Sequence, residues 1–305
     1  MIHRLFLAIC LAALYSAAAG RAVQGVEPVS ASQSVPQPPD KWRYTLFDPT
    51  PADQLRGMDT DRPNATNTPH TIDAGHLQLE AGALDYSYYR DRSINDDVRS
   101  DDFSFGQFNF RLGLLNNLEV NAVIDAYDLD RSRRYDTRTS ARAAGFGDTV
   151  VGGKLNFWGD DGGEQVWTTA FAVQAQFKVP TARSNVGNGR FEFSVAFPFL
   201  MNLPAGFHLD YQPGVSYQRD SLNGGYVTGM ENAVSIDRVV WRNLDVYLEY
   251  ASDVTTESHV KAVQTLDVGG SYSLSDNVVI DLGVNFGLNN ASTTVEMLTG
   301  VSVRF

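Results

Sequence analysis

Alternation of apolar and polar residues is the feature that most limits what this chain can fold into. It begins near Gly75 and continues to Phe305. Successive side chains of a β-strand point to opposite faces, so an alternating segment has one apolar and one polar face. The clearest segment, 190–201, carries a row of apolar residues on one face: Phe191, Phe193, Val195, Phe197 and Phe199. The pattern therefore predicts an all-β fold.

Twelve segments show this alternation. Their predicted boundaries are 75–89, 102–114, 118–128, 148–158, 165–179, 190–201, 206–219, 226–236, 244–252, 262–274, 278–288 and 295–305. The alternation slips near Gly82 and Gly106, where we expect a bulge to shift the register. Short connections alternate with longer ones, notably 90–101 and 129–147, which are expected to be polar loops. Hairpins that open on opposite sides of a membrane have this arrangement.

A soluble β-sandwich would alternate in the same way, but two features argue against it. Most segments have about 10–14 residues, whereas strands of soluble proteins usually have about five or six. The polar face carries a charged or amide side chain in almost every segment, which a packed apolar core does not tolerate. A watery lumen tolerates it, and a sheet in lipid must close to pair its backbone. We therefore predict a transmembrane antiparallel up-and-down β-barrel of about 12 strands, with both termini in the periplasm.

The ends of the predicted strands support a membrane barrel. Aromatic residues gather there, as in the interfacial girdles of such barrels. The final segment alternates through Val301 and Val303 and ends on an aromatic carboxy-terminus, Phe305. This ending resembles the signal that outer-membrane barrels present to the barrel-assembly machinery. We therefore expect that machinery and outer-membrane lipid as partners.

The amino-terminal part of the chain divides into several segments. Residues 1–19 have a cationic start, an apolar stretch and an Ala-Ala-Ala end, which predict a cleaved signal peptide for export to the bacterial outer membrane. Residues 20–40 are predicted to be a proline-rich flexible linker. Residues 41–73 are expected to be a periplasmic segment that either plugs the barrel or seats the chain, with a short helix near 48–56. Residues 74–305 form the predicted barrel.

Acidic residues outnumber basic ones, and a formal net charge of −12 excludes non-specific binding to nucleic acid. The alternation assigns many strand acids to the lumen face. These candidates for solute selectivity are Glu80, Glu119, Asp125, Glu192, Asp210, Glu231, Glu249, Asp267 and Asp281. An acidic lumen would favour cations over anions. The alternative is that these acids pair with bases and neighbours and merely fill a narrow barrel.

A short motif precedes and enters the first predicted strand. It comprises Thr60, Asp61, Arg62, Pro63, Thr66, Pro69, Thr71, Gly75, Gln78 and Glu80. The motif resembles the opening of the outer-membrane transporters grouped as the meta-pathway of phenol degradation family, with Asn64 and Thr68 in place of the usual Asp and Ser. The resemblance implies an outer-membrane channel for small solutes, such as aromatic or other hydrophobic compounds. With Asp59 and Asp61 beside it, Arg62 either forms an ion-pair cluster at the barrel mouth or lies in a solvated turn.

The sequence predicts no catalytic site, metal site or cofactor. His208 and Asp210 share one face of a predicted strand and are the best enzymatic candidate, but a chance pair of lumen residues is the simpler interpretation. Two classes of function remain. One is a channel for passive diffusion of a small-molecule solute. The other is a barrel without transport, which is structural or adhesive or hydrolyses lipid or peptide.

Overall fold

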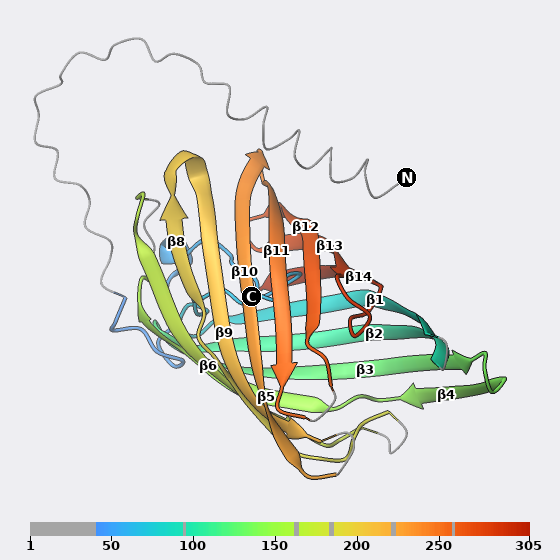
Figure 1. Ribbon diagram of the computed structural model, residues 1–305. Helices are drawn as coiled ribbons and strands as arrows, with labels where there is room; N and C mark the ends of the chain where they lie inside the picture. Colours follow the sequence, from blue (N-terminus) through green and yellow to red (C-terminus); the bar gives the residue numbers. More distant parts are fainter. Residues whose placement is uncertain (1–40, 94–95, 162–164, 183–185, 221–223, 258–259) are drawn as a thin grey trace, which may run out of the picture.

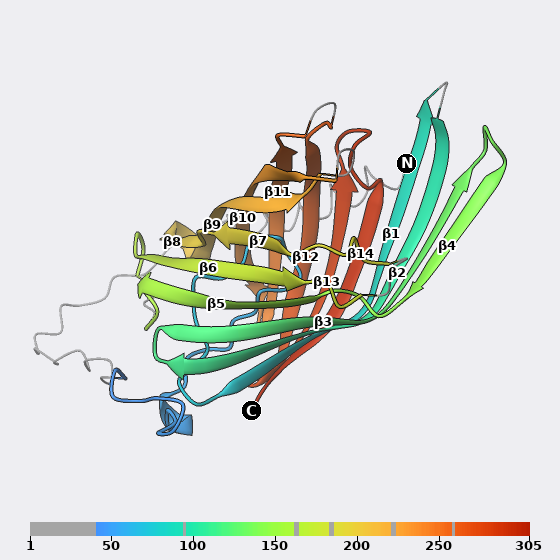
Figure 2. The same cartoon turned by 90° about the horizontal axis from the view of Figure 1, so that it is seen from below.

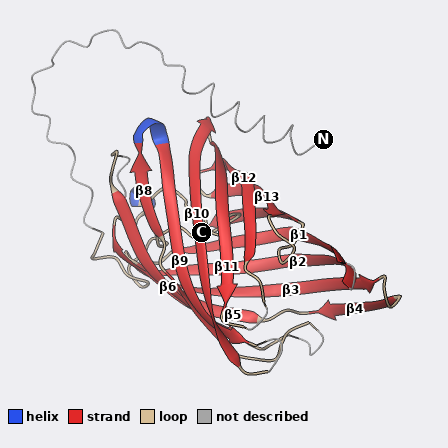
Figure 3. Ribbon diagram, viewed as in Figure 1, coloured by secondary structure: helices blue, strands red, loops and turns tan. Residues whose placement is uncertain are grey.

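The computed structural model describes residues 41–93, 96–161, 165–182, 186–220, 224–257 and 260–305. The predicted signal peptide and linker lie outside these residues. Almost all regular structure is antiparallel β-sheet that closes on itself (Figures 1 and 3). The helical elements of the described chain are two short 3-10 turns, η1 (Ala52–Gln54) and η2 (Pro204–Gly206). Within the same residues, no helix is long and apolar enough to cross a membrane.

The barrel is built from strands in chain order. They are β1 (Leu77–Ser93), β2 (Asp96–Leu115), β3 (Leu118–Arg134), β4 (Thr139–Gly145), β5 (Thr149–Trp158), β6 (Thr169–Val179), β7 (Glu192–Ala196), β8 (Phe199–Leu203), β9 (Phe207–Arg219), β10 (Tyr226–Trp241), β11 (Leu244–Thr255), β12 (Val263–Ser275), β13 (Val278–Gly287) and β14 (Val295–Arg304).

These labelled strands make a closed barrel of twelve. β4 and β5 both pair with β3, so they continue one another. β7 and β8 both lie between β6 and β9 and also count as one. Pairing of β1 with β14 completes the circle. The prediction of an all-β antiparallel barrel with about twelve strands is confirmed.

The segment predicted as one strand at 190–201 is interrupted, because β7 ends at Ala196 and β8 begins at Phe199. Pro198 lies in the gap and has no N–H to donate to a neighbouring strand. Hydrogen bonds to the neighbouring strands still keep these residues in the sheet. Phe197 N donates to Pro213 O over 2.9 Å, and Ala172 N donates to Pro198 O over 2.9 Å. The apolar alternation concealed this interruption.

The polar stretches 90–101 and 129–147 were predicted to be loops, and this was wrong over most of their length. β1 continues to Ser93, β2 begins at Asp96, β3 reaches Arg134, and β4 returns beside β3. These ends of β1–β4 project beyond the other strands (Figure 2). Where neither face of a sheet packs against an apolar medium, pairing does not require alternation. The pattern therefore underestimated their length.

Two smaller predictions need correction. In place of the short helix near 48–56 there is only η1, and no side chain caps it. The backbone nearby bonds elsewhere, since Arg56 N donates to the Asp73 carboxylate over 3.0 Å. The register shift expected at Gly82 is present. At Gly106 the ladder keeps its register, and the glycine instead adopts a left-handed φ of 72°.

The barrel is polar inside and apolar outside. Its largest fully buried side chains are charged or amide groups, headed by Arg111, Lys154, Gln78, Glu80 and Glu119. Large apolar side chains such as Phe193, Val215 and Leu282 are exposed on the outer surface. Burying apolar surface favours folding in water, so this inversion indicates that the outer face meets lipid.

Candidate functional site

The segment before β1, residues 41–73, lies against and within the barrel and is called the lumen segment below. Its first part crosses the barrel end at which the short turns and Phe305 lie. There Leu46 N donates to Leu114 O over 2.9 Å, and the Arg304 guanidinium donates to Arg56 O over 2.7 Å. At this end of the barrel, the first part of the lumen segment is tied to its last residue, because Asp73 forms ion pairs with Arg56 at 3.0 Å and with Lys41 at 3.4 Å.

The second part of the lumen segment enters the barrel. Asn67 donates from its backbone to Gln212 of β9 and from its side chain to Gln174 of β6, both over 2.9 Å. The Thr66 backbone and hydroxyl donate to Glu249 of β11, and Ile72 N donates to Glu119 of β3 over 2.8 Å. These four strands lie on different sides of the barrel. The segment therefore occupies the lumen.

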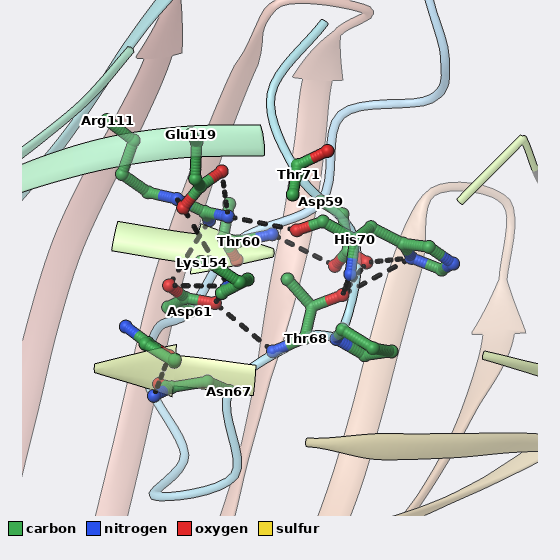
Figure 4. Close-up of polar contacts among 12 residues, drawn as sticks. Asp59, Thr60, Asp61, Asn67, Thr68, His70, Thr71, Arg111, Glu119 and Lys154 are labelled. Atoms are coloured by element: carbon green, nitrogen blue, oxygen red, sulfur yellow. Dashed lines mark hydrogen bonds and ion pairs between the residues drawn. The ribbon is translucent and has the colours of Figure 1, made fainter. Parts of the chain in front are cut away.

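A buried charge cluster holds the segment against β2, β3 and β5 (Figure 4). Arg111 is fully buried and lies 2.9 Å from Glu80, 2.9 Å from Glu119 and 3.4 Å from Asp61 of the segment. Lys154 Nζ lies 2.9 Å from the same Asp61. Such a cluster is favourable only when its charges are paired, because each ion has lost its hydration. Asp61 completes it.

Arg62 and Pro63 lie in a recess made by glycines. A methyl group at Gly82 or Gly300 would lie 3.0 or 2.8 Å from the Arg62 guanidinium, and one at Gly283 would lie 3.2 Å from Pro63. In this recess Arg62 approaches Asp85 at 3.3 Å and Asp281 at 3.6 Å. Its sequence neighbours bind elsewhere, as Asp61 pairs with Lys154. Arg62 thus forms an ion-pair cluster, but with acids of the barrel wall.

Asp59 forms a polar contact within the lumen segment. His70 Nδ1 lies 2.8 Å from a carboxylate oxygen of Asp59, and the Thr68 hydroxyl donates to the same oxygen. Burial is the largest single influence on the Asp59 carboxyl and would raise its pKa. The hydrogen bonds from His70 and Thr68, together with the positive charges of His70 and Arg111, outweigh burial and hold that pKa well below its usual range. Asp59 is therefore an anion at neutral pH.

The other motif residues have mainly positioning contacts. Thr60 Oγ1 donates to Arg62 O over 2.9 Å, and Pro69 O accepts from Asn156 over 3.0 Å. Gln78 donates to Asp59 O over 2.7 Å. Gly75 has a φ of 78°, and a side chain there would collide with Pro49. The motif residues thus position the lumen segment inside the barrel.

The predicted selectivity acids divide into two groups. Glu80, Glu119, Glu249 and Asp281 contact the lumen segment; Glu80 does so by accepting from Asp61 N over 3.2 Å. The remaining five contact wall residues or lie apart from the segment: Asp125 accepts from Gln107, Glu192 pairs with Lys178, Asp267 accepts from Thr265, Glu231 lies opposite Gly214, and Asp210 lines a cavity. Four of the nine expected lining acids are therefore engaged by the lumen segment.

Sequence reasoning missed two sets of contacts. Asp160, which was not among the candidate residues, pairs with Arg56 and accepts from Thr71 N over 2.9 Å. His208 bonds to Asp237 of β10 over 2.8 Å rather than to Asp210. The register between β9 and β10 sets His208 opposite Asp237, and no local sequence signal fixes that register.

A cavity of about 760 Å³ remains beside the lumen segment. It lies between the segment and strands β8–β12. Its lining includes Asp59, His208, Asp210, Asp237, Asp245 and Tyr247. The bases that also line it are engaged, since Arg56 pairs with Asp73 and Arg62 with Asp85. On its β9–β11 side the cavity is lined by the carboxyl groups of Asp210, Asp237 and Asp245, with His208 beside them.

The chain is similar to a known protein family in sequence and to outer-membrane proteins in structure. The model of the family described as "MetA-pathway of phenol degradation" matches residues 60–305. An outer membrane channel from Pseudomonas putida F1 is similar in structure, with a TM-score of 0.59 and 11% identity over 81% of this chain and 100% of that chain. The NanC porin has a TM-score of 0.45 and 9% identity over 74% of this chain and 98% of that chain. No curated protein matches the sequence.

Proposed function

The chain belongs to the MetA-pathway of phenol degradation family, and from that premise we propose that it is an outer-membrane channel for small solutes whose passage is restricted by its own lumen segment. The observation that carries the proposal is the cavity between the lumen segment and β8–β12. Its volume of about 760 Å³ lies within the range that holds small organic ligands. A barrel that served only as a scaffold would not need it.

The lining favours a particular class of solute. Tyr247, Val239 and Leu200 supply apolar surface. The Asp59 anion supplies negative charge, and Asp210 and Asp245 add two further carboxyl groups. Because fixed charges of one sign in a narrow passage attract ions of the opposite sign, small aromatic solutes that are neutral or cationic would enter more readily than anionic ones. The family resemblance implies aromatic or other hydrophobic solutes, and the cavity lining adds a preference for neutral or cationic ones.

Uptake by proteoliposomes tests this proposal. Benzyltrimethylammonium and benzenesulfonate have similar size and opposite charge, and we expect the cation to enter faster. Asp245→Asn removes one carboxyl group from the cavity wall and should reduce the ratio of the two uptake rates, because fewer acidic groups then face the solute. Asp136→Asn, at an exposed turn far from the cavity, is the matched control and should leave the ratio unchanged. Faster entry of benzenesulfonate, or entry no faster than into empty liposomes, would contradict the proposal.

A further inference from the structure

The projecting ends of β1–β4 carry five arginines on one face, named here the arginine face. They are Arg90, Arg99, Arg131, Arg133 and Arg142. The concentration is unusual in a chain with a net charge of −12. It lies at the barrel end opposite the short turns, where β1–β4 extend furthest (Figure 2).

The arginine face continues the outer surface of the barrel. Gly300 of β14 faces Arg62 in the lumen, so Glu296, four residues earlier on the same strand, also faces inward. Ser87 donates to Glu296 over 3.1 Å and therefore points inward as well. Tyr88 and Arg90 then occupy the outward rows of β1. Register carries these rows across the sheet, from Tyr88 to Asp101, Arg131 and Arg142, and from Arg90 to Arg99 and Arg133.

Like charges lie directly opposite one another on this face. Arg90 is the register partner of Arg99, Arg99 of Arg133, and Arg131 of Arg142. Directly opposed like charges destabilise a sheet. Asp97 and Asp101 offset only part of this charge, through Arg90 and Arg99. In the described chain, no salt bridge engages Arg131, Arg133 or Arg142.

Aromatic residues border the arginine face on its barrel side. Tyr86 and Phe103 are register partners in the adjacent outward row, and their rings lie 4.9 Å apart. Phe105 and Tyr127 continue the aromatic surface, with 40% and 41% of their areas exposed. Aromatic belts mark the interface between hydrocarbon and headgroups. The arginines therefore begin where lipid headgroups begin.

We propose that the arginine face binds the phosphate groups of anionic lipid headgroups in the surrounding leaflet. Guanidinium groups bind phosphate oxygens in pairs of parallel hydrogen bonds. A shallow hollow of about 330 Å³ is lined by Arg99, Arg131, Arg133 and Arg142 and also by Asp101. Asp101 pairs with Arg99, so the other three arginines remain to bind a phosphate there. A bound phosphate would relieve the repulsion between the opposed arginines. The proposal rests on the barrel fold and is independent of the proposed channel.

Binding of lipid A to the detergent-solubilised full chain tests the proposal, because lipid A carries phosphates on its headgroup. Arg131→Gln combined with Arg133→Gln should weaken binding by about tenfold or more, since each lost charge-assisted contact contributes appreciably. Arg134→Gln combined with Arg138→Gln is the matched control. It removes the same charge from the same hairpin, at the opposite face and at the turn, and should bind like the wild type.

Further variants and probes separate the effect of charge from that of the guanidinium group, and loss of binding from loss of folding. Arg131→Lys with Arg133→Lys retains the charge without the planar fork and should bind with intermediate affinity. Heat-modifiable migration on a gel verifies that each barrel is folded. Equal binding by the two glutamine double variants, or equal binding of dephosphorylated lipid A, would overturn the proposal. Inorganic phosphate bound as tightly as lipid A would overturn it too, because the site would then recognise a free anion.

Discussion

Deleting residues 41–73 is expected to make the barrel permeable to solutes that the full chain excludes. Removing the lumen segment takes away the backbone and side chains that bond to Glu119, Gln174, Gln212 and Glu249. A twelve-stranded barrel without an internal segment leaves a wider aqueous passage. Proteoliposomes carrying the deleted chain should therefore swell in raffinose, whereas those carrying the full chain should not.

A graded variant tests the same interpretation. Glu249→Gln keeps the lumen segment but weakens its anchor at Ala65 and Thr66, whose backbone groups donate to this carboxylate. Its permeability to raffinose should lie between those of the full chain and the deleted chain. If the deleted chain folds, as judged by heat-modifiable migration, and still excludes raffinose, the lumen segment is not the obstruction.

Arg111→Met is expected to produce the largest loss of stability of any single substitution considered. Arg111 is fully buried and neutralises Glu80, Glu119 and Asp61 together with Lys154. Removing it leaves carboxylates buried with too little positive charge nearby, and breaking a buried ion pair in this way costs about 3–5 kcal/mol. Unfolding in urea, monitored by the loss of heat-modifiable migration, should occur at a markedly lower concentration.

The control for Arg111→Met is Arg99→Met. Arg99 is also paired with an acid, at 2.7 Å from Asp101, but it is exposed. Water already solvates such a pair, so its removal should change the urea midpoint far less. In Arg111→Met, the additional substitution Glu119→Gln removes one uncompensated charge and should recover part of the lost stability. Similar midpoints for Arg111→Met and Arg99→Met would contradict the role assigned to the buried cluster.

The strands that cross the barrel wall could be predicted from the sequence because lipid and lumen impose opposite demands on alternate residues. Val278 to Gly287 shows this most clearly: its apolar row is exposed at Ile280 and Leu282, while Asp281 is buried. The same reasoning failed for β3 beyond Asp128 and for β4, where that contrast ends. It also failed at Pro198, whose missing donor interrupts a strand without interrupting the pattern.

Membership of the lumen face could be predicted, but the partners within the lumen could not. Glu80 and Glu119 were assigned inward by period two, and both contact Arg111 there. That Asp61 would join them depends on the path of a segment without periodicity. The pairing of His208 with Asp237 depends on strand register in the same way. Long-range pairing of this kind requires the fold.

Single-channel conductance of the full chain in a planar bilayer under a salt gradient tests the central claim most directly. We expect discrete conductance steps with a reversal potential that favours cations, because the Asp59 anion and the carboxyl groups of Asp210 and Asp245 line the cavity left beside the lumen segment. Deleting residues 41–73 should enlarge the steps. A silent bilayer for both the full and the deleted chain, with folded protein demonstrated in each, would contradict the claim that this barrel is a channel.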